Sequence, residues 1–362
     1  MTGLLPGEPA PMFMAPSPIN PHFTFGSLGG RYILLAFMPP PGPEREAIIA
    51  LVRKNAAVFA GDGKIFFGVL SDATGFEDVP QDLPLRWFAD PNGEIRRLYG
   101  AVDADGAPMP QWMLIDPSLR YMGSAPLSDG ERLIAKIATY GSPDDHAGVP
   151  MHAPVLIVPR VFEPAFCRQL IDLYNAKGGE PSGVMQARGG KTIGVLNDMK
   201  KRRDADIDDE ELQAQIRLRI SRRLIPEIKK SFQFTATRIE RYIVACYSAE
   251  EGGYFRPHRD NTTPGTAHRR FAVSINLNAE EFEGGDLRFP EFGSRTYRPP
   301  TGGAVVFSCS LLHEATPVAR GVRYACLPFL YDDAAATIRQ ANMHTIVMQT
   351  GDPVEAPPQA AV

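Results

Sequence analysis

The sequence contains few cysteines, no long apolar run and no excess of positive charge. Only four of 362 residues are cysteine, none precedes Cys167 and no CxxC pair occurs, so a disulfide framework is excluded and a reducing, cytoplasmic location is expected. No stretch approaches the roughly 18 apolar residues of a membrane helix, and the N-terminus lacks the pattern of a signal peptide. A formal net charge of −4 gives no reason to expect nucleic-acid binding.

The composition is that of a globular protein, with 44% hydrophobic and 22% charged residues. The length favours about two domains. Proline, glycine and charge cluster where hydrophobic periodicity stops, which predicts a linker at 143–153. We therefore expect a first domain at 1–142, a second at 154–332, and a C-terminal extension at 333–362 with a disordered end.

The first domain alternates short apolar runs with amphipathic segments. Buried strands are predicted at 31–37 and 64–70, with a helix at 43–59 between them. Further elements are expected as a weak strand at 85–90, a short helix ending at Gly100, a hairpin at 112–123 and a helix at 129–140. This order is typical of a three-layer α/β domain.

Several motifs in residues 4–140 resemble the thioredoxin-fold peroxiredoxins. They are GEPAPMF, YILLAFMP, FFGVLSD, DPNGEIRRLYGAV and MLIDPSLRYMG. The peroxidatic thiolate of that family would follow YILLAFMP, but the chain reads PPPGPERE there. Since peroxidase chemistry needs a sulfur nucleophile, we expect a non-catalytic thioredoxin-like scaffold, partner surface or specificity element.

The second domain changes from helices to strands. Amphipathic helices are predicted at 164–177 and 209–231, separated by a polar, basic loop at 189–208. The strands that follow are expected within 238–248, 254–261, 269–278, 284–292, 296–308, 311–318 and 322–332. Helices on such an all-β core are consistent with a double-sheet jelly roll, a double-stranded β-helix.

Two histidines and one carboxylate form a possible metal set. His258 and Asp260 are two residues apart, so on an extended strand both side chains project to one face. His313 follows 55 residues later on another predicted strand. Imidazole and carboxylate suit Fe(II), and three protein ligands leave positions for a co-substrate and dioxygen. The alternatives are a surface turn at the first pair and a hydrogen-bonded core histidine at 313.

Arg323 follows the second histidine by ten residues. On a strand it would share a face with Ala325, and an inward guanidinium could bind a carboxylate through two parallel hydrogen bonds. A buried arginine needs an acidic partner. That partner is either a ligand or a protein acid such as Asp286.

Four segments together resemble the prolyl 4-hydroxylase-like group of Fe(II)/2-oxoglutarate dioxygenases. They are RYIVACYSAEEGGYFRPHRDN, RFAVSINLNAEEFEGGDLRFPEF, GGAVVFSCSLLHEATPV and GVRYACLPFLYD, within 153–332. The resemblance implies a jelly roll, hydroxylation of a C–H bond with release of succinate and CO₂, and Fe(II), 2-oxoglutarate and L-ascorbate as cofactors. The hydroxylated group would be a prolyl residue or a free amino acid.

The same resemblance assigns residues. It implies His258, Asp260 and His313 as iron ligands, with Arg323 on the distal carboxylate of 2-oxoglutarate. Tyr247 matches a tyrosine that lines the co-substrate pocket, although one extra residue separates it from the histidine. Asn276 stands where some prolyl hydroxylases have a tyrosine near the co-substrate.

Other polar residues have simpler interpretations. His268 is expected in an exposed loop without a metal, and Arg269 and Arg270 as a solvated pair, one of which could guide an acidic substrate. The basic stretch 200–203 is expected to be a solvated loop or, by resemblance, a lid over the substrate. The cysteines at 246, 309 and 326 are expected to be core thiols.

Three other functions remain open at this point. A thiol peroxidase lacks its cysteine, a zinc hydrolase could use the same ligands, and a non-catalytic interaction module could be built on the two folds. The expected partners are a protein, peptide or small-molecule substrate, with no nucleic acid and no membrane. A homo-oligomer could form through exposed sheet edges of the first domain.

Overall fold

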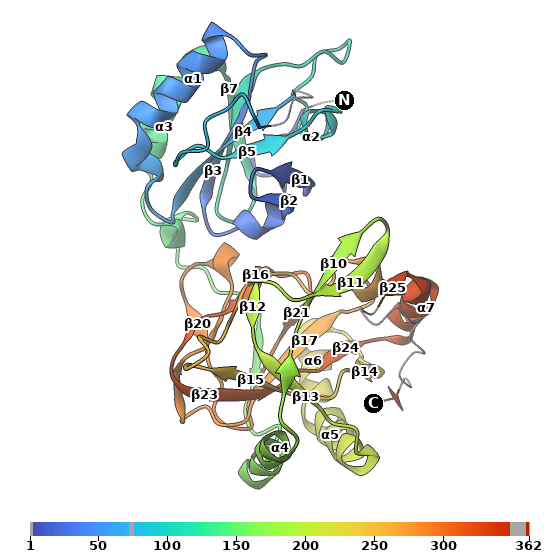
Figure 1. Ribbon diagram of the computed structural model, residues 1–362. Helices are drawn as coiled ribbons and strands as arrows, with labels where there is room; N and C mark the ends of the chain where they lie inside the picture. Colours follow the sequence, from blue (N-terminus) through green and yellow to red (C-terminus); the bar gives the residue numbers. More distant parts are fainter. Residues whose placement is uncertain (1–2, 72–75, 348–359, 362) are drawn as a thin grey trace. The chain divides into compact units, whose positions relative to one another are not determined.

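The structure is a computed structural model that describes residues 3–71, 76–347 and 360–361. The chain divides into two compact units (Figure 1). One comprises residues 1–153 and 290–294, the other 154–289 and 295–362. The expected linker therefore lies within the first unit, where 143–145 forms a short 3-10 helix.

The first unit is built on a five-stranded sheet in the order β5-β4-β3-β6-β7. The strands are β3 (Tyr32–Phe37), β4 (Lys64–Leu70), β5 (Trp87–Ala89), β6 (Gln111–Ile115) and β7 (Tyr121–Pro126). Every residue of β3 is buried because this strand is central, parallel to β4 and antiparallel to β6. The predicted strands and the hairpin are confirmed in this unit.

Both faces of that sheet are covered (Figure 1). The helices α1 (Pro43–Lys54) and α3 (Gly130–Ala138) bury Ile48, Val52 and Ile134 against one face. The opposite face packs against α2 (Glu94–Leu98) and a 3-10 helix, Phe25–Leu28. The hairpin of β1 (Met14–Ser17) and β2 (Asn20–Thr24) was not predicted, because its strands are mostly exposed and have no continuous apolar run.

The described residues of the second unit form three sheets. The largest follows the order β26-β14-β24-β17-β23-β15-β13-β9, with β18, β21 and β8 joined at its sides. Its strands are β8 (Leu156–Val158), β9 (Glu180–Pro181), β13 (Arg203–Asp206), β14 (Arg238–Glu240), β15 (Ile243–Ser248), β17 (Phe271–Asn276), β18 (Phe282–Gly284), β21 (Ala304–Ser308), β23 (Val318–Cys326), β24 (Phe329–Tyr331) and β26 (Ala360–Ala361).

A five-stranded sheet has the order β12-β16-β22-β19-β20, and a three-stranded sheet the order β10-β11-β25. Their strands are β10 (Val184–Arg188), β11 (Lys191–Val195), β12 (Lys200–Lys201), β16 (Tyr254–His258), β19 (Leu287–Arg288), β20 (Thr296–Tyr297), β22 (His313–Ala315) and β25 (Ile346–Val347). The expected loop at 189–208 is therefore wrong, since most of it forms strands in hairpin and cross-strand pairs.

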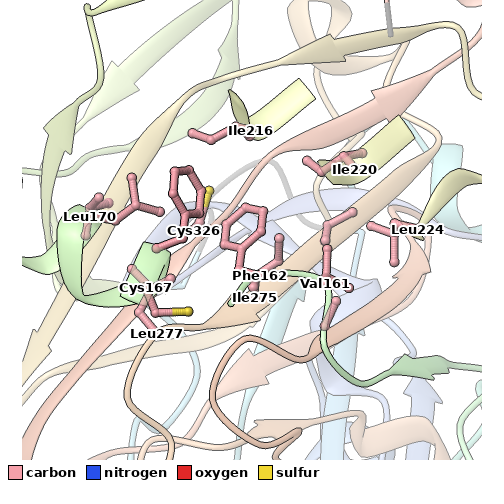
Figure 2. Packing of buried hydrophobic residues seen from close by; sticks show 14 of the residues in the cluster. Val161, Phe162, Cys167, Leu170, Ile216, Ile220, Leu224, Ile275, Leu277 and Cys326 are labelled. Carbon is pink, nitrogen blue, oxygen red and sulfur yellow. The ribbon is translucent and has the colours of Figure 1, made fainter. Parts of the chain in front are cut away.

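Three helices pack on the large sheet. They are α4 (Pro164–Lys177), α5 (Glu210–Arg223) and α6 (Ile225–Phe232). Figure 2 shows Leu170, Ile216 and Ile220 of these helices facing Cys326 and Ile275 of the sheet, all of them buried. The single helix expected at 209–231 is broken at Leu224, because Pro226 lacks an N–H and its ring clashes with the preceding turn.

The beginning of the C-terminal extension belongs to the second unit. Helix α7 (Asp333–Asn342) follows β24 directly, and β25 pairs in parallel with β11. The disordered end expected after it falls largely on residues 348–359 and 362, which lie outside the described residues. Within the described ranges, every helix is too short or too polar to cross a membrane.

Candidate metal centre

A cavity in the second unit is lined by residues of both its larger sheets. Tyr247, Ser274 and Arg323 contribute from β15, β17 and β23 of the large sheet. His258 and His313 contribute from β16 and β22 of the five-stranded sheet. Tyr247 and Arg323, which are 76 positions apart in the sequence, thus line the same cavity.

The three predicted metal ligands converge in this cavity. Antiparallel pairing of β16 with β22 sets His258 directly opposite His313. Asp260 follows the end of β16, where its backbone N–H donates to the Cys309 carbonyl at 2.9 Å. One ligand atom from each residue lies within 4.8 Å of the other two, which is the spacing that a shared cation requires.

Hydrogen bonds orient both imidazoles toward that common point. The Nδ1 of His258 lies 2.7 Å from the Arg256 carbonyl, and the Nδ1 of His313 lies 3.0 Å from the Leu311 carbonyl. A carbonyl only accepts, so each Nδ1 carries the proton and each Nε2 keeps its lone pair. The Nε2 atoms lie 3.7 Å and 3.3 Å from the two carboxylate oxygens of Asp260.

The electrostatics favour the protonation states that bind metal. Burial, followed by the neighbouring His313, lowers the pKa of His258 to about 3. Burial alone would raise the pKa of Asp260, but its interaction with the neighbouring His313 outweighs burial and holds this pKa below its ordinary value. At neutral pH the His258 imidazole is therefore neutral and the Asp260 carboxylate ionised.

Arg323 lies in the cavity wall with only 3% of its surface exposed. Its Nη1 donates to the Gly285 carbonyl at 2.7 Å and its Nη2 to the Ser274 hydroxyl at 2.8 Å. Its buried Nε has no hydrogen-bond partner among the described residues. No carboxylate of the described residues forms an ion pair with its guanidinium. The protein acid considered above, Asp286, pairs with Arg298 instead.

The two remaining predicted pocket residues, Tyr247 and Asn276, differ in their position relative to the cavity. Tyr247 lines the cavity, and its hydroxyl accepts from Arg202 Nη1 at 3.4 Å. Asn276 is not among the cavity-lining residues of the described structure. Its Nδ2 donates to the Pro299 carbonyl at 2.9 Å, because Asn276 is the last residue of β17 and lies beyond Ser274 along the strand. The role of Asn276 near the co-substrate therefore stays a prediction.

The prediction for the 200–203 stretch as a solvated loop is also wrong. Lys200 and Arg202 are 9% and 7% exposed, and they lie in and beside strands β12 and β13. Arg202 lines the cavity and donates to Asp204 at 2.6 Å. Burial and the nearby Arg202 lower the pKa of Lys200 to about 6. The basic cluster is thus part of the packed unit.

His268 and Arg269 are not solvated either. His268 is 1% exposed, and its Nε2 lies 2.7 Å from Glu240. Arg269 donates to the same carboxylate at 2.6 Å and lies over the Phe329 ring. The metal set of the described residues consists of His258, Asp260 and His313. The exposed-loop prediction fails because a carboxylate 28 residues earlier compensates the burial of both side chains.

The cysteine predictions are confirmed. Cys246, Cys309 and Cys326 are free and buried, as is Cys167. Burial raises the pKa of Cys326 to about 12. These thiols therefore have the properties of core residues.

Among the charged residues of the cavity, Arg241 was not predicted. Arg241 lines the cavity, yet in the segment RIERYIVACYS it reads as one more residue of a continuous strand. The structure interrupts that strand between β14 and β15, where Arg241 has a φ of 68°. The sequence signal that was available is the cluster of polar residues at 240–241 inside an otherwise apolar run.

The comparisons with known proteins concern this region. Residues 242–331 match the family profile of the 2OG-Fe(II) oxygenase superfamily, a range that contains all three metal-set residues and Arg323. A PKHD-type hydroxylase of Cupriavidus metallidurans is 36% identical over 95 residues, 24% of this chain and 42% of that protein. Another, of Delftia acidovorans, is 39% identical over 84 residues, 21% of this chain and 37% of that protein. The matches thus span less than half of these relatives.

Two solved structures illustrate the structural similarities. A Pseudomonas putida prolyl-4-hydroxylase matches with 18% identity and a TM-score of 0.38, covering 52% of this chain and 96% of that one. A structure described as a thiol:disulfide interchange protein DsbE, from Chlorobium tepidum, matches with 20% identity and a TM-score of 0.32, covering 38% of this chain and 99% of that one. By the profile match and the hydroxylase relatives, residues 242–331 are similar to the 2OG-Fe(II) oxygenase superfamily.

Proposed function

We propose that the chain is an Fe(II)- and 2-oxoglutarate-dependent dioxygenase that hydroxylates a C–H bond and releases succinate and CO₂. The observation that carries this proposal is the convergence of His258, Asp260 and His313 in one cavity with the buried Arg323. We take residues 154–332 as the dioxygenase domain and its two larger sheets as a double-stranded β-helix.

The residues present fit the iron ion. Two imidazoles and one carboxylate form the ligand set that non-haem Fe(II) oxygenases use, and they leave coordination positions open. The carbonyl groups of Arg256 and Leu311 hold the two rings in the required tautomer. Bound iron and 2-oxoglutarate would together supply the oxidising chemistry that the side chains themselves lack.

The residues around the metal set would bind and orient the co-substrate. Arg323 has donor capacity left after its bonds to Gly285 and Ser274, so it would hold the distal carboxylate of 2-oxoglutarate. Tyr247 would line the same pocket. Phe255 stacks on His258 with ring centroids 3.4 Å apart, and such apolar walls keep water from the reacting centre.

The substrate class follows from the resemblance in sequence. The segments around the site are similar to the prolyl 4-hydroxylase-like group, so we propose a prolyl residue of a peptide or a free amino acid. L-Ascorbate would serve as reductant for iron after uncoupled turnover. The first unit, without a cysteine, would act as a scaffold or partner surface and as the site of any homo-oligomer contact.

The test is a spectroscopic and product assay on the full chain. Anaerobic addition of Fe(II) and 2-oxoglutarate should produce a weak visible charge-transfer band, and admission of air should release succinate. His258→Ala should abolish both, whereas the exposed His22 offers a control, His22→Ala, that should retain both. A wild-type protein with neither band nor succinate would refute the proposed function.

A further inference from the structure

Arg241 is held rigidly in the cavity wall. Its Nε and Nη2 both donate to the Leu327 carbonyl, at 2.9 and 2.7 Å, and its guanidinium lies 4.4 Å from the Phe329 ring centroid. Its φ of 68° falls in the left-handed region that side-chain-bearing residues rarely adopt. Strain of this kind persists where the surroundings impose it, and it is concentrated at functional sites.

Within the described structure the charge of Arg241 is compensated only from a distance: Asp204 and Asp260 attract it, but neither pairs with it. Arg202 pairs with Asp204, and Arg269 pairs with Glu240. No carboxylate forms an ion pair with Arg241 among the described residues, and its hydrogen bonds there use Nε and Nη2 alone. A partly buried cation without a counter-ion of its own is costly, so an anion is the group that this position favours.

The co-substrate does not supply that anion. A divalent metal and Arg323 carry three positive charges, which Asp260 and the two carboxylates of 2-oxoglutarate cancel. Arg202 is neutralised by Asp204, and Lys200, with its pKa lowered to about 6, is mostly uncharged at neutral pH. The positive charge of Arg241 is what remains.

We propose that Arg241 binds a carboxylate of the molecule to be oxidised, and is thus a specificity-determining residue. This inference rests on the proposed function. Two sources offer the same chemistry: the α-carboxylate of a free amino acid and the side-chain carboxylate of an acidic peptide. Arg241 takes the role that the sequence had suggested for Arg269 or Arg270.

The experiment compares matched probes on the full chain with Fe(II) and 2-oxoglutarate. The first pair is a pool of free L-amino acids and the same pool as amides. The second pair is a pool of acetylated, amidated tripeptides containing Asp or Glu, and its counterpart with Asn or Gln. Succinate release and a mass gain of one oxygen atom are measured for each pool.

We expect stimulation of succinate release by one carboxylate pool, and no more than background with its amide counterpart. The pair that responds identifies the source of the carboxylate. In Arg241→Gln the KM for the stimulating pool should rise about ten- to a hundredfold, the loss expected for a charge-assisted hydrogen bond. Arg241→Lys keeps the charge but lacks the planar guanidinium, so its KM should lie between those of the wild type and Arg241→Gln.

A matched control is Arg270→Gln. Arg270 donates to the Ala267 carbonyl at 3.1 Å and does not line the cavity. The Arg270→Gln variant should therefore prefer the carboxylate pool over the amide pool as strongly as the wild type does. The wild-type comparison of carboxylate with amide does not depend on any variant folding.

Three results would overturn the inference. They are equal stimulation by carboxylate and amide pools, stimulation by neither, and a tenfold loss of 2-oxoglutarate affinity in Arg241→Gln, which would assign Arg241 to the co-substrate. Absence of the charge-transfer band in the wild type would instead refute the proposed function, and this inference with it.

Discussion

Replacing Arg323 with alanine removes the one guanidinium proposed to face the distal carboxylate of 2-oxoglutarate. In the structure its Nη1 and Nη2 are anchored on Gly285 and Ser274, and its Nε is free within the described residues. One or two charge-assisted bonds to the co-substrate, each worth about 1.5–3 kcal/mol, amount to about 3 kcal/mol. The affinity for 2-oxoglutarate should therefore fall about a hundredfold.

The assay is anaerobic titration of the Fe(II) complex with 2-oxoglutarate, followed by the charge-transfer band. The affinity of Arg323→Lys for 2-oxoglutarate should fall about tenfold, because lysine keeps the charge but not the bidentate geometry. Arg320→Ala is the control: Arg320 lies on the same strand, β23, but its side chain is 77% exposed and paired with Glu283. Its affinity for 2-oxoglutarate should equal that of the wild type.

Iron binding separates this role from a structural one. Arg323 makes no contact with the three metal ligands in the described structure, so Arg323→Ala should bind Fe(II) as the wild type does. An unchanged 2-oxoglutarate affinity in Arg323→Ala would refute the assignment. A parallel loss of iron affinity would instead mean that Arg323 supports the cavity as a whole.

Two further predictions concern stability. Ile220 is fully buried between α5 and the large sheet (Figure 2), so Ile220→Ala should cost about 2–5 kcal/mol of unfolding free energy in urea titrations; a change below about 1 kcal/mol would contradict this packing. Burial and Arg202 lower the pKa of Lys200 from 10.5 to about 6, so between these values the unfolded chain binds a proton that the folded chain does not. The free energy of unfolding should therefore fall as the pH drops through this window. In Lys200→Met this fall should be smaller by more than about 1 kcal/mol. Identical pH profiles of melting temperature for both proteins would contradict the assignment.

Much of the metal set could be predicted from the sequence because its geometry is local. Alternation along a strand sets His258 and Asp260 on one side, and the positions of His313 and Arg323 follow from ordered motifs. The buried strands of the first unit were found for a similar reason, since a continuous apolar run such as that of β3 is a local property. The break at Pro226 was also readable locally, although the repeat of apolar residues every four positions obscured it.

The burial of charged side chains was decided only by the tertiary structure. Whether His268 or Arg241 is solvated depends on partners far away in the chain: Glu240 for His268, and Leu327 for Arg241. Asn276 shows how finely packing decides such contacts, because only two positions along β17 separate Ser274 in the cavity wall from Asn276, which donates to the Pro299 carbonyl. A sequence determines periodicity and which side chains share a face; it does not determine which remote group neutralises a charge, since that requires the packing of all the strands around it.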